Sequence, residues 1–210
     1  MHTACILLNG EKPSKDLACD ITRGVKVYCC DGAADWAAPY GIAMDFLVGD
    51  MDSIHPDNRK KAVSSTTRVI ELNPDKDITD GQYALELAIE NGEREMILLG
   101  ALGGRIDHTI ANINMMIAAH KAHRGCKIIT DSCELFVANT SFLVQGTIGQ
   151  TISILPIDAN VHIRSTTGLF YPCKNTTLQH ENTLFISNRF SKEEAGVFFD
   201  GGYVLVIIQK

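Results

Sequence analysis

The stretch DFLVGDMDS, residues 45–53, joins a short apolar run to two carboxylates that stand two positions apart. Phe46–Val48 has the continuous apolar character of a strand that is covered on both faces, as in a parallel sheet. Asp50 and Asp52 follow where this strand should end. If the extended conformation persists past Gly49, both side chains point to one face and can bind one divalent cation. A solvated polar turn is the alternative interpretation.

Strand-like runs and amphipathic stretches alternate through the N-terminal part of the chain. The other predicted strands are Ala4–Leu8, Val25–Cys30, Arg68–Leu72, Met96–Leu99 and Lys127–Thr130. Helices are predicted over Thr79–Asn91 and over His108–His123, where Ile110, Ile113 and Ile117 share the stripe expected to be buried. Strands that alternate with helices predict an α/β fold with a doubly wound, mostly parallel sheet, which binds ligands at the carboxyl ends of its strands.

After about Asp131 the pattern changes to short β-rich runs separated by turn residues. The predicted strands lie within residues 134–144, 151–157, 161–168, 182–188 and 196–210. Reversals are expected at Asn139-Thr140, Asp158–Asn160 and Asp200–Gly202. We therefore predict two domains, an α/β domain over residues 1–131 and a smaller all-β, sandwich-like domain over residues 132–210.

The composition is typical of a globular protein and argues against several classes of partner. Of the 210 residues, 45% are hydrophobic and 21% are charged, and the formal net charge is -6. The basic residues are scattered, so we expect neither nucleic acid nor an anionic membrane as a partner. A signal-peptide pattern and a run of about 18 apolar residues are both missing, so we expect a cytoplasmic protein. The seven cysteines form no CxxC pair and are expected to be reduced thiols.

A second acidic cluster, PDKDITD over residues 74–80, follows the fourth predicted strand. Asp77 at the N-cap and Asp80 at the third helical position would satisfy free N–H groups without any further function. Alternatively, these carboxylates share one crevice with Asp50 and Asp52, because the carboxyl ends of parallel strands meet at one edge of a sheet. So much negative charge is costly without a cation. Magnesium fits, since it takes one or two carboxylates together with waters and substrate phosphates.

Two glycine-containing turns follow other predicted strands. In GALGGRIDH, residues 100–108, the glycines allow a phosphate to approach, the helix start offers free N–H groups, and Arg105 offers a planar fork. The stretch matches neither the P-loop nor the dinucleotide fingerprint, and a structural turn with Asp107 capping the helix is the alternative. In CCDGAADW, residues 29–36, Asp31 is either a ligand for a ribose or base, or part of a capped helix start.

Taken in order, these motifs resemble those of the thiamin pyrophosphokinase (thiamin diphosphokinase) family. The resemblance rests on DGAADW, GDMDS, DKDITD and GALGGRIDH, and in the second half on TTGLFYP and on ISN followed by Gly-Gly near the terminus. It extends over nearly the whole chain. The family's fold, an α/β nucleotide-binding domain followed by a β-sandwich-like domain, agrees with the fold predicted above.

The resemblance implies transfer of a pyrophosphoryl group from ATP to the hydroxyl of thiamin, which gives thiamin diphosphate and AMP. It also implies a catalytic and Mg²⁺-binding set in which Asp77 or Asp80 joins Asp50 and Asp52. One remaining carboxylate would orient or deprotonate the hydroxyl, and the sequence leaves open which one. The residues expected to bind ATP are Asp31, Ser53, Gly103, Gly104, Arg105, Asp107 and His108.

The resemblance further implies a homodimer, with thiamin between the α/β domain of one chain and the β domain of the other. Tyr171 is expected to stack on thiamin, because an aromatic face attracts the cationic thiazolium; a half-buried strand aromatic is the alternative. Many relatives have GLKW where this chain has GLFY, so Phe170 replaces a lysine. Ser187 and Asn188 match a Ser-Asn pair of the family and are expected to hydrogen-bond the aminopyrimidine.

Two other functions remain open at this point. A related diphosphokinase that acts on a pterin alcohol would keep the ATP and magnesium motifs and differ in the pocket of the β domain. A non-catalytic nucleotide-binding module would use the acidic turns only to stabilise its fold.

Overall fold

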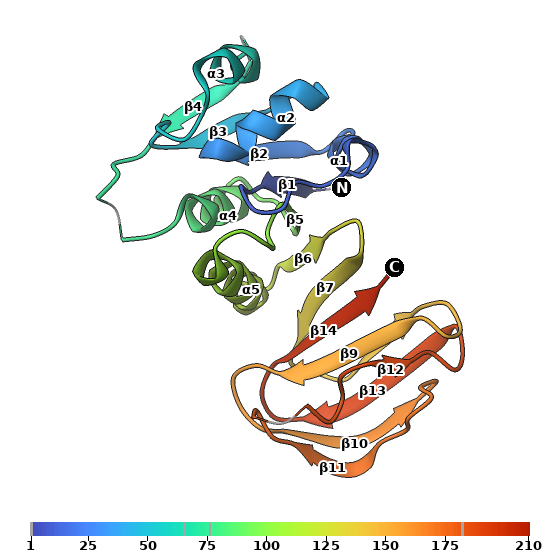
Figure 1. The fold of residues 1–210 in the computed structure, drawn as a ribbon. Coiled ribbons are helices and arrows are strands. Elements are labelled where there is room, and N and C mark those ends of the chain that lie inside the picture. The colour runs from blue at the N-terminus through green and yellow to red at the C-terminus, as the bar shows by residue number, and fades with distance from the viewer. Residues whose placement is uncertain (1, 65, 76, 182) are drawn as a thin grey trace. The chain divides into compact units, whose positions relative to one another are not determined.

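The computed structural model describes residues 2–64, 66–75, 77–181 and 183–210. The chain divides into two compact units, Met1–Asp131 and Ser132–Lys210. Figure 1 shows strands and helices in the first unit and strands in the second. Lys76, within the motif DKDITD, and Asn182, at the start of a predicted strand, lie outside the described residues. Among the described residues, no helix has the length and apolar character needed to cross a membrane.

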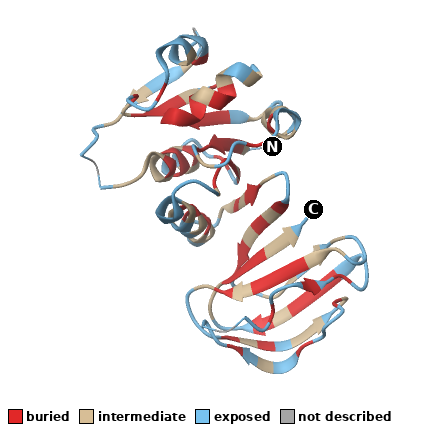
Figure 2. Cartoon of the chain, viewed as in Figure 1, coloured by how far each residue is buried: buried red, intermediate tan, exposed pale blue. Residues whose placement is uncertain are grey.

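A parallel sheet forms the centre of the N-terminal unit. Its strands are β1 (Thr3–Leu7), β2 (Lys26–Cys30), β3 (Phe46–Gly49), β4 (Arg68–Glu71), β5 (Glu95–Leu99) and β6 (Gly125–Ile129). They are ordered β6-β5-β1-β2-β3-β4, and neighbouring strands pair in parallel. The central strands β1, β2 and β3 are buried along almost their whole length (Figure 2). The predicted parallel α/β sheet is confirmed, and each strand lies within two residues of its predicted bounds.

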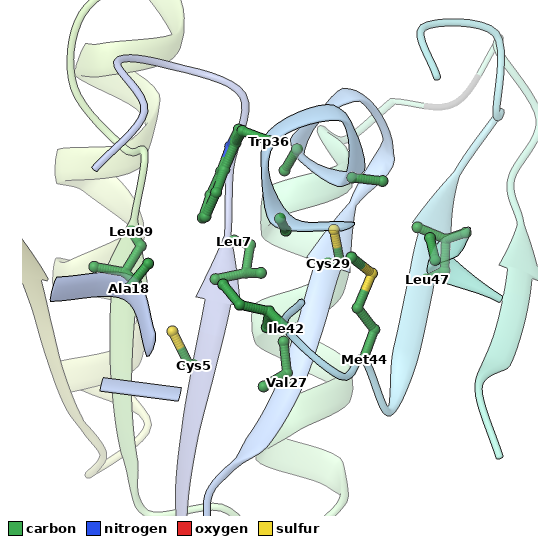
Figure 3. Close-up of a cluster of buried hydrophobic side chains, with 14 of the residues drawn as sticks. Cys5, Leu7, Ala18, Val27, Cys29, Trp36, Ile42, Met44, Leu47 and Leu99 are labelled. Atoms are coloured by element: carbon green, nitrogen blue, oxygen red, sulfur yellow. The ribbon is translucent and has the colours of Figure 1, made fainter. Parts of the chain in front are cut away.

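Helices connect these strands. They are α1 (Lys15–Thr22), α2 (Ala34–Tyr40), α3 (Pro56–Ala62), α4 (Asp80–Glu90) and α5 (Ile106–Lys121), with a short 3₁₀ helix, η1 (Asp31–Ala33), before α2. Alternate strand residues, such as Cys5 and Leu7 in β1 and Val27 and Cys29 in β2, belong to one apolar cluster with Trp36 of α2 (Figure 3). This period of two is the geometry of a strand, and it gives the sheet one face for this helix layer.

The start of α4 differs from the prediction. Its N-cap is Thr79, whose Oγ1 accepts a hydrogen bond from the N–H of Gln82 at 3.1 Å. The prediction that Asp77 caps the helix is therefore wrong, and Asp80 is the first helical residue and not the third. The threonine hydroxyl is placed one residue before the helix, where it reaches a free N–H group of the first turn.

The predicted buried stripe of α5 is also wrong. The buried residues of this helix are Asn112, Met115, Met116 and Ala119. Ile110 is 55% exposed, and Ile113 and Ile117 are only partly buried. Two apolar stripes adjoin on this helix, and periodicity alone does not say which one is covered. Asn112 tolerates burial because its Nδ2 donates a hydrogen bond to Ala101 O at 2.7 Å.

The C-terminal unit is built from β-strands. They are β7 (Cys133–Ala138), β8 (Phe142–Gln145), β9 (Thr151–Pro156), β10 (Val161–Thr167), β11 (Lys174–Leu178), β12 (Asn188–Arg189), β13 (Glu194–Asp200) and β14 (Val204–Gln209). They pair antiparallel in two groups, ordered β12-β9-β14-β7 and β11-β10-β13-β8. Residues of both groups share one core, which includes Ile154, Ile163, Val197 and Val206. The predicted sandwich-like β fold is confirmed.

In this unit one predicted strand is wrong and one observed strand was not predicted. Residues 184–187 form a turn, and only Asn188 of the predicted strand belongs to β12. Ser187 has φ +60°, which interrupts an extended conformation. The strand β11 was not predicted, because its sequence KNTTL is mostly polar and lacks the apolar alternation of a half-buried strand.

Backbone hydrogen bonds hold together the carboxyl ends of β1 and β5. The N–H of Leu8 donates to Leu99 O, and the N–H of Gly10 donates to Gly100 O, both at 2.8 Å. Gly100 has φ +66°, and a Cβ at this position would lie 2.2 Å from Leu8 O. Glycine is therefore needed at position 100 both for its φ angle and for the space it leaves.

We expect Gly100→Ala to lower the free energy of unfolding by about 3 kcal/mol, because the new methyl group meets Leu8 O in a conformation unfavourable to L residues. Gly24→Ala is the matched control, since Gly24 has φ +73° but no atom within 4 Å of a Cβ. There we expect only the conformational cost, about 1 kcal/mol. Urea denaturation of the three proteins measures both values. Equal losses would show that the close contact at Leu8 does not matter.

Candidate active site

A cavity of about 350 Å³ lies at the carboxyl ends of β1, β2, β3 and β5. It is lined by the turns after these strands and by the first residues of α4 and α5. The lining residues are Leu8, Asn9, Gly10, Cys30, Asp31, Gly32, Asp50, Asp52, Ser53, Thr79, Asp80, Gly81, Gly100, Ala101, Gly103, Arg105, His108 and Asn112. This is the edge of a doubly wound sheet at which ligands bind.

Three carboxylates form an acidic cluster in this cavity. Oxygens of Asp31, Asp50 and Asp52 all lie within 4.8 Å of one another. The strand does not continue in the way that the sequence suggested, because β3 ends at Gly49 and Met51 has φ +67°. Instead the chain turns, and the N–H of Asp52 donates to Asp50 Oδ1 at 3.3 Å. The carboxylates of Asp50 and Asp52 therefore approach each other through a turn.

Asp31 is the buried member of the acidic cluster. It is only 8% exposed, its φ of +35° is unusual for a residue with a side chain, and its Oδ1 has no hydrogen-bond partner among the described residues. Gly49 leaves room for it, since a Cβ at Gly49 would lie 2.7 Å from Asp31 Cβ. A buried acceptor without a partner is costly, so this oxygen is suited to bind a cation.

The surroundings of Asp31 also disfavour its charge. Burial raises the pKa of Asp31 above its ordinary value of 3.8, and the negative charges of Asp50, Asp80 and Asp52 raise that pKa further. A hydrogen bond with Ser53 lowers the pKa and so acts in the opposite direction. A divalent cation beside these carboxylates would relieve the repulsion between them.

The turn between β5 and α5 depends on its glycines. Gly103 and Gly104 have φ +76° and +65°, and a Cβ at Gly103 would lie 2.9 Å from Glu11 Cβ. Because α5 begins at Ile106, the free N–H groups of its first turn follow directly after these glycines. Such an arrangement is a general binding site for phosphate groups.

Arg105, which lines the cavity, already has a partner. Its Nε and Nη2 donate to Asp107 Oδ1 and Oδ2 at 3.1 and 2.6 Å, and this contact lowers the pKa of Asp107. Arg105 occupies the N-cap position that was considered for Asp107, while Asp107 Oδ1 accepts a hydrogen bond from the N–H of His108 at 3.0 Å. The Arg105 side chain is 71% exposed, so its guanidinium is accessible to a phosphate that competes with Asp107.

The cavity contains most of the residues predicted to bind ATP and magnesium. Those that line it are Asp31, Asp50, Asp52, Ser53, Asp80, Gly103, Arg105 and His108. The described residues that do not line it include Asp77, Gly104 and Asp107. Sequence analysis missed Asn9 and Gly10, although an Asn-Gly pair directly after a strand is a turn signal. It also missed Asn112, whose burial inside a helix leaves no sequence signal.

The residues predicted to contact thiamin lie in the C-terminal unit. Tyr171 is 56% exposed, and its ring centroid lies 4.9 Å from that of Phe170, at an interplanar angle of 80°. The guanidinium of Arg189 lies 4.6 Å from the Phe170 ring centroid. Ser187 is exposed, whereas Asn188 is only 2% exposed. The ring of Tyr171 is thus accessible to a ligand, whereas the side-chain amide of Asn188 is not.

Comparison with known families gives two matches in order along the chain. The family model described as "Thiamin pyrophosphokinase, catalytic domain" matches residues 22–130. The family model described as "Thiamin pyrophosphokinase, vitamin B1 binding domain" matches residues 142–204. The first match includes the acidic cluster and the glycine turn, and the second includes Tyr171, Ser187 and Asn188.

Individual relatives carry the same name. "Thiamine pyrophosphokinase" of Bacillus subtilis (strain 168) is 26% identical over 161 residues, which cover 76% of this chain and 75% of that protein. "Thiamine pyrophosphokinase 1" of Oryza sativa subsp. japonica is 25% identical over 174 residues, which cover 78% of this chain. The matched region spans 65% of the rice protein, slightly less than two thirds of its length.

Solved structures show the same fold over the full chain. The crystal structure of thiamine pyrophosphokinase from Bacillus subtilis has a TM-score of 0.88 at 23% identity, with 99% of both chains covered. Thiamin pyrophosphokinase from Candida albicans has a TM-score of 0.84 at 18% identity, with 99% of this chain and 89% of that chain covered. Because family models for both halves match in sequence and the fold agrees from end to end, this chain belongs to the thiamin pyrophosphokinase family.

Proposed function

We propose that this chain is a thiamin diphosphokinase, which transfers the pyrophosphoryl group of ATP to the hydroxyl of thiamin. The observation that carries the proposal is the acidic cluster beside a glycine- and arginine-containing turn in one cavity, in a chain of this family. The hydroxyl oxygen would bond to the β-phosphorus, and the bond from that phosphorus to the oxygen shared with the α-phosphate would break. That oxygen leaves with AMP, and the hydroxyl loses its proton to a base.

The acidic cluster fits a magnesium ion. All three residues offer carboxylate oxygens, which are the hard ligands that Mg²⁺ prefers. One of these oxygens, Asp31 Oδ1, has no hydrogen-bond partner among the described residues. We propose that Asp50 and Asp52 hold the ion, as the sequence predicted, with Asp31 as the third carboxylate in place of the exposed Asp77. Asp80 adds negative charge from the start of α4. Bound magnesium would neutralise charge on the phosphate oxygens of ATP.

The turn after β5 is the proposed phosphate site. Gly103 allows close approach, the first turn of α5 offers N–H groups, and Arg105 offers a planar pair of donors. Asp107 accepts hydrogen bonds from two of these donors in the free protein, so a phosphate would compete with Asp107 for them. His108, in the first turn of α5, also lines the cavity and completes the proposed ATP-binding residues.

For the other substrate we propose Tyr171 as the stacking residue. Its exposed ring can cover the pyrimidine or attract the cationic thiazolium of thiamin. Ser187 remains a proposed hydrogen-bonding partner of the aminopyrimidine. We also propose that the protein acts in the cytoplasm as a homodimer, with thiamin bound at the interface between the two chains.

The reaction is tested by measuring AMP formation from ATP and magnesium with thiamin, with a hydroxymethylpterin, and with neither. We expect AMP only with thiamin, together with an equal amount of thiamin diphosphate. AMP formation with the pterin alone would instead support the related pterin diphosphokinase. If ATP binds but neither alcohol gives AMP, the chain is a nucleotide-binding module and the proposal is wrong.

We expect Asp52→Asn to lower turnover by at least about a hundredfold, because one ligand of the metal loses its charge. Asp20→Asn is the control, since Asp20 is an exposed residue of α1 that pairs with Arg23 at 2.9 Å, and its turnover should stay within about twofold. Thermal unfolding should show both variants folded. A loss below tenfold for Asp52→Asn would argue against a metal-binding role.

We expect Asp31→Asn to stabilise the metal-free protein at neutral pH. The pKa of Asp31 is raised in the folded state, so the fold favours the protonated carboxyl. Its contribution to the free energy of unfolding is fully present below the ordinary pKa of 3.8 and is lost as the pH rises through the raised pKa. The gain in stability of the variant over the wild type should therefore grow as the pH rises above 3.8 through the raised pKa, in urea denaturation with EDTA. Asp20→Asn should show a much smaller change. An equal change in both variants would show that the buried charge of Asp31 does not destabilise the metal-free protein.

A further inference from the structure

Asn188 lies where two segments of the C-terminal unit run antiparallel. Leu169 and Phe190 form an isolated antiparallel bridge. Next to it, the N–H of Phe170 donates to Arg189 O at 2.8 Å, as expected for continued strand pairing. This ladder brings residue 171 opposite residue 188.

At that point the Asn188 side chain replaces backbone pairing. Its Oδ1 accepts hydrogen bonds from the N–H of Tyr171 at 3.0 Å and from the N–H of Arg189 at 2.8 Å. Its Nδ2 donates to Tyr171 O at 2.8 Å. Both backbone groups of Tyr171 are thus bonded to a single side chain. The contact is built into the fold, because Asn188 is only 2% exposed.

These bonds leave the Asn188 amide poorly suited to bind a substrate directly. An amide oxygen accepts two hydrogen bonds, and both are used inside the protein. One N–H of the amide nitrogen is also used. Releasing any of these groups to a ligand would break a part-buried hydrogen bond with the backbone of Tyr171 or Arg189, which is costly.

The same bonds fix the backbone that carries the aromatic ring. Pro172 follows Tyr171 and restricts it to extended conformations. The ring itself remains 56% exposed, and it packs edge-to-face with the ring of Phe170. A ring on a fixed backbone loses little freedom when a planar ligand stacks on it, so preorganisation favours binding.

We propose that Asn188 is a positioning residue, which makes the exposed face of Tyr171 available for thiamin by holding the Tyr171 backbone. This assignment rests on the proposed function and replaces the prediction that the Asn188 amide contacts the aminopyrimidine. It makes thiamin affinity depend on Asn188 only through Tyr171. ATP affinity and turnover at saturating thiamin are independent of Asn188.

The first test is Asn188→Ala, with substrate affinities measured by calorimetry and by steady-state kinetics. The Kd and KM for thiamin should rise about tenfold, as expected for lost hydrogen bonds to one loop, while the KM for ATP and kcat change less than about twofold. Gln145→Ala is the matched control, because Gln145 in β8 also uses its amide in a hydrogen bond, to Glu194 at 2.8 Å. It should leave all constants unchanged. Equal changes for both substrates with Asn188→Ala would overturn the proposal.

The decisive test is the double variant. Tyr171→Ala alone should weaken thiamin binding and leave ATP binding unchanged. Adding Asn188→Ala to Tyr171→Ala should weaken thiamin binding by less than about threefold more, because the hydrogen bonds of Asn188 then have no aromatic ring to position. If the two effects multiply in full, Asn188 contacts thiamin itself and the proposal is wrong.

Asn188→Asp covers the case in which the alanine variant does not fold. It keeps the size of the side chain and the two accepted hydrogen bonds, but it replaces the donor to Tyr171 O by a carboxylate oxygen that repels this carbonyl oxygen. We expect the Kd for thiamin to rise on the wild-type background, and not to rise on the Tyr171→Ala background. A wild-type protein that binds thiamin without forming AMP would refute the proposed reaction and leave this calorimetric test intact. A wild-type protein that does not bind thiamin would refute both.

Discussion

The cavity of the N-terminal unit depends on the close contact between the backbones that leave β1 and β5. Hydrogen bonds from Leu8 to Leu99 and from Gly10 to Gly100 place these two turns against each other with no side chain between them. The strands of a parallel sheet all end at one edge, so this contact sets the distance between the turn after β5 and the rest of the cavity. A side chain at Gly100 would separate the two turns and change the shape of the site.

A second constraint on the cavity is electrostatic, because the fold gathers carboxylates that repel one another. Asp31 combines a left-handed backbone, burial and an oxygen without a described partner. Strained and unsatisfied groups of this kind are kept where a ligand uses them, since they cost stability in its absence. The acidic cluster and the nearby Arg105 thus offer opposite charges to a magnesium-bound triphosphate. This division of charge is what connects the structure of the unit to the proposed transfer reaction.

The predictions succeeded where a pattern was local and failed where it was not. Short strand-like runs located each parallel strand, and the turn residues after them located most of the cavity lining. In α5 two apolar stripes compete, and only packing against the rest of the unit decides that Met115 and Met116 are covered. The strand predicted at residues 182–188 failed because Ser187, with φ +60°, interrupts an extended conformation, and β11 was missed because its polar sequence has no alternation.

The sequence by itself determined the alternation of strands and helices in the N-terminal unit, the polar residues at the strand ends, and the family, because these depend on short-range patterns and on ordered motifs. Only the tertiary structure decided that Asp31 joins Asp50 and Asp52 while Asp77 stays outside the cavity. It alone decided that Asn188 bonds to the backbone of Tyr171. These contacts join residues from different turns and strands, and their distances are fixed by how the sheets pack and not by their spacing along the chain.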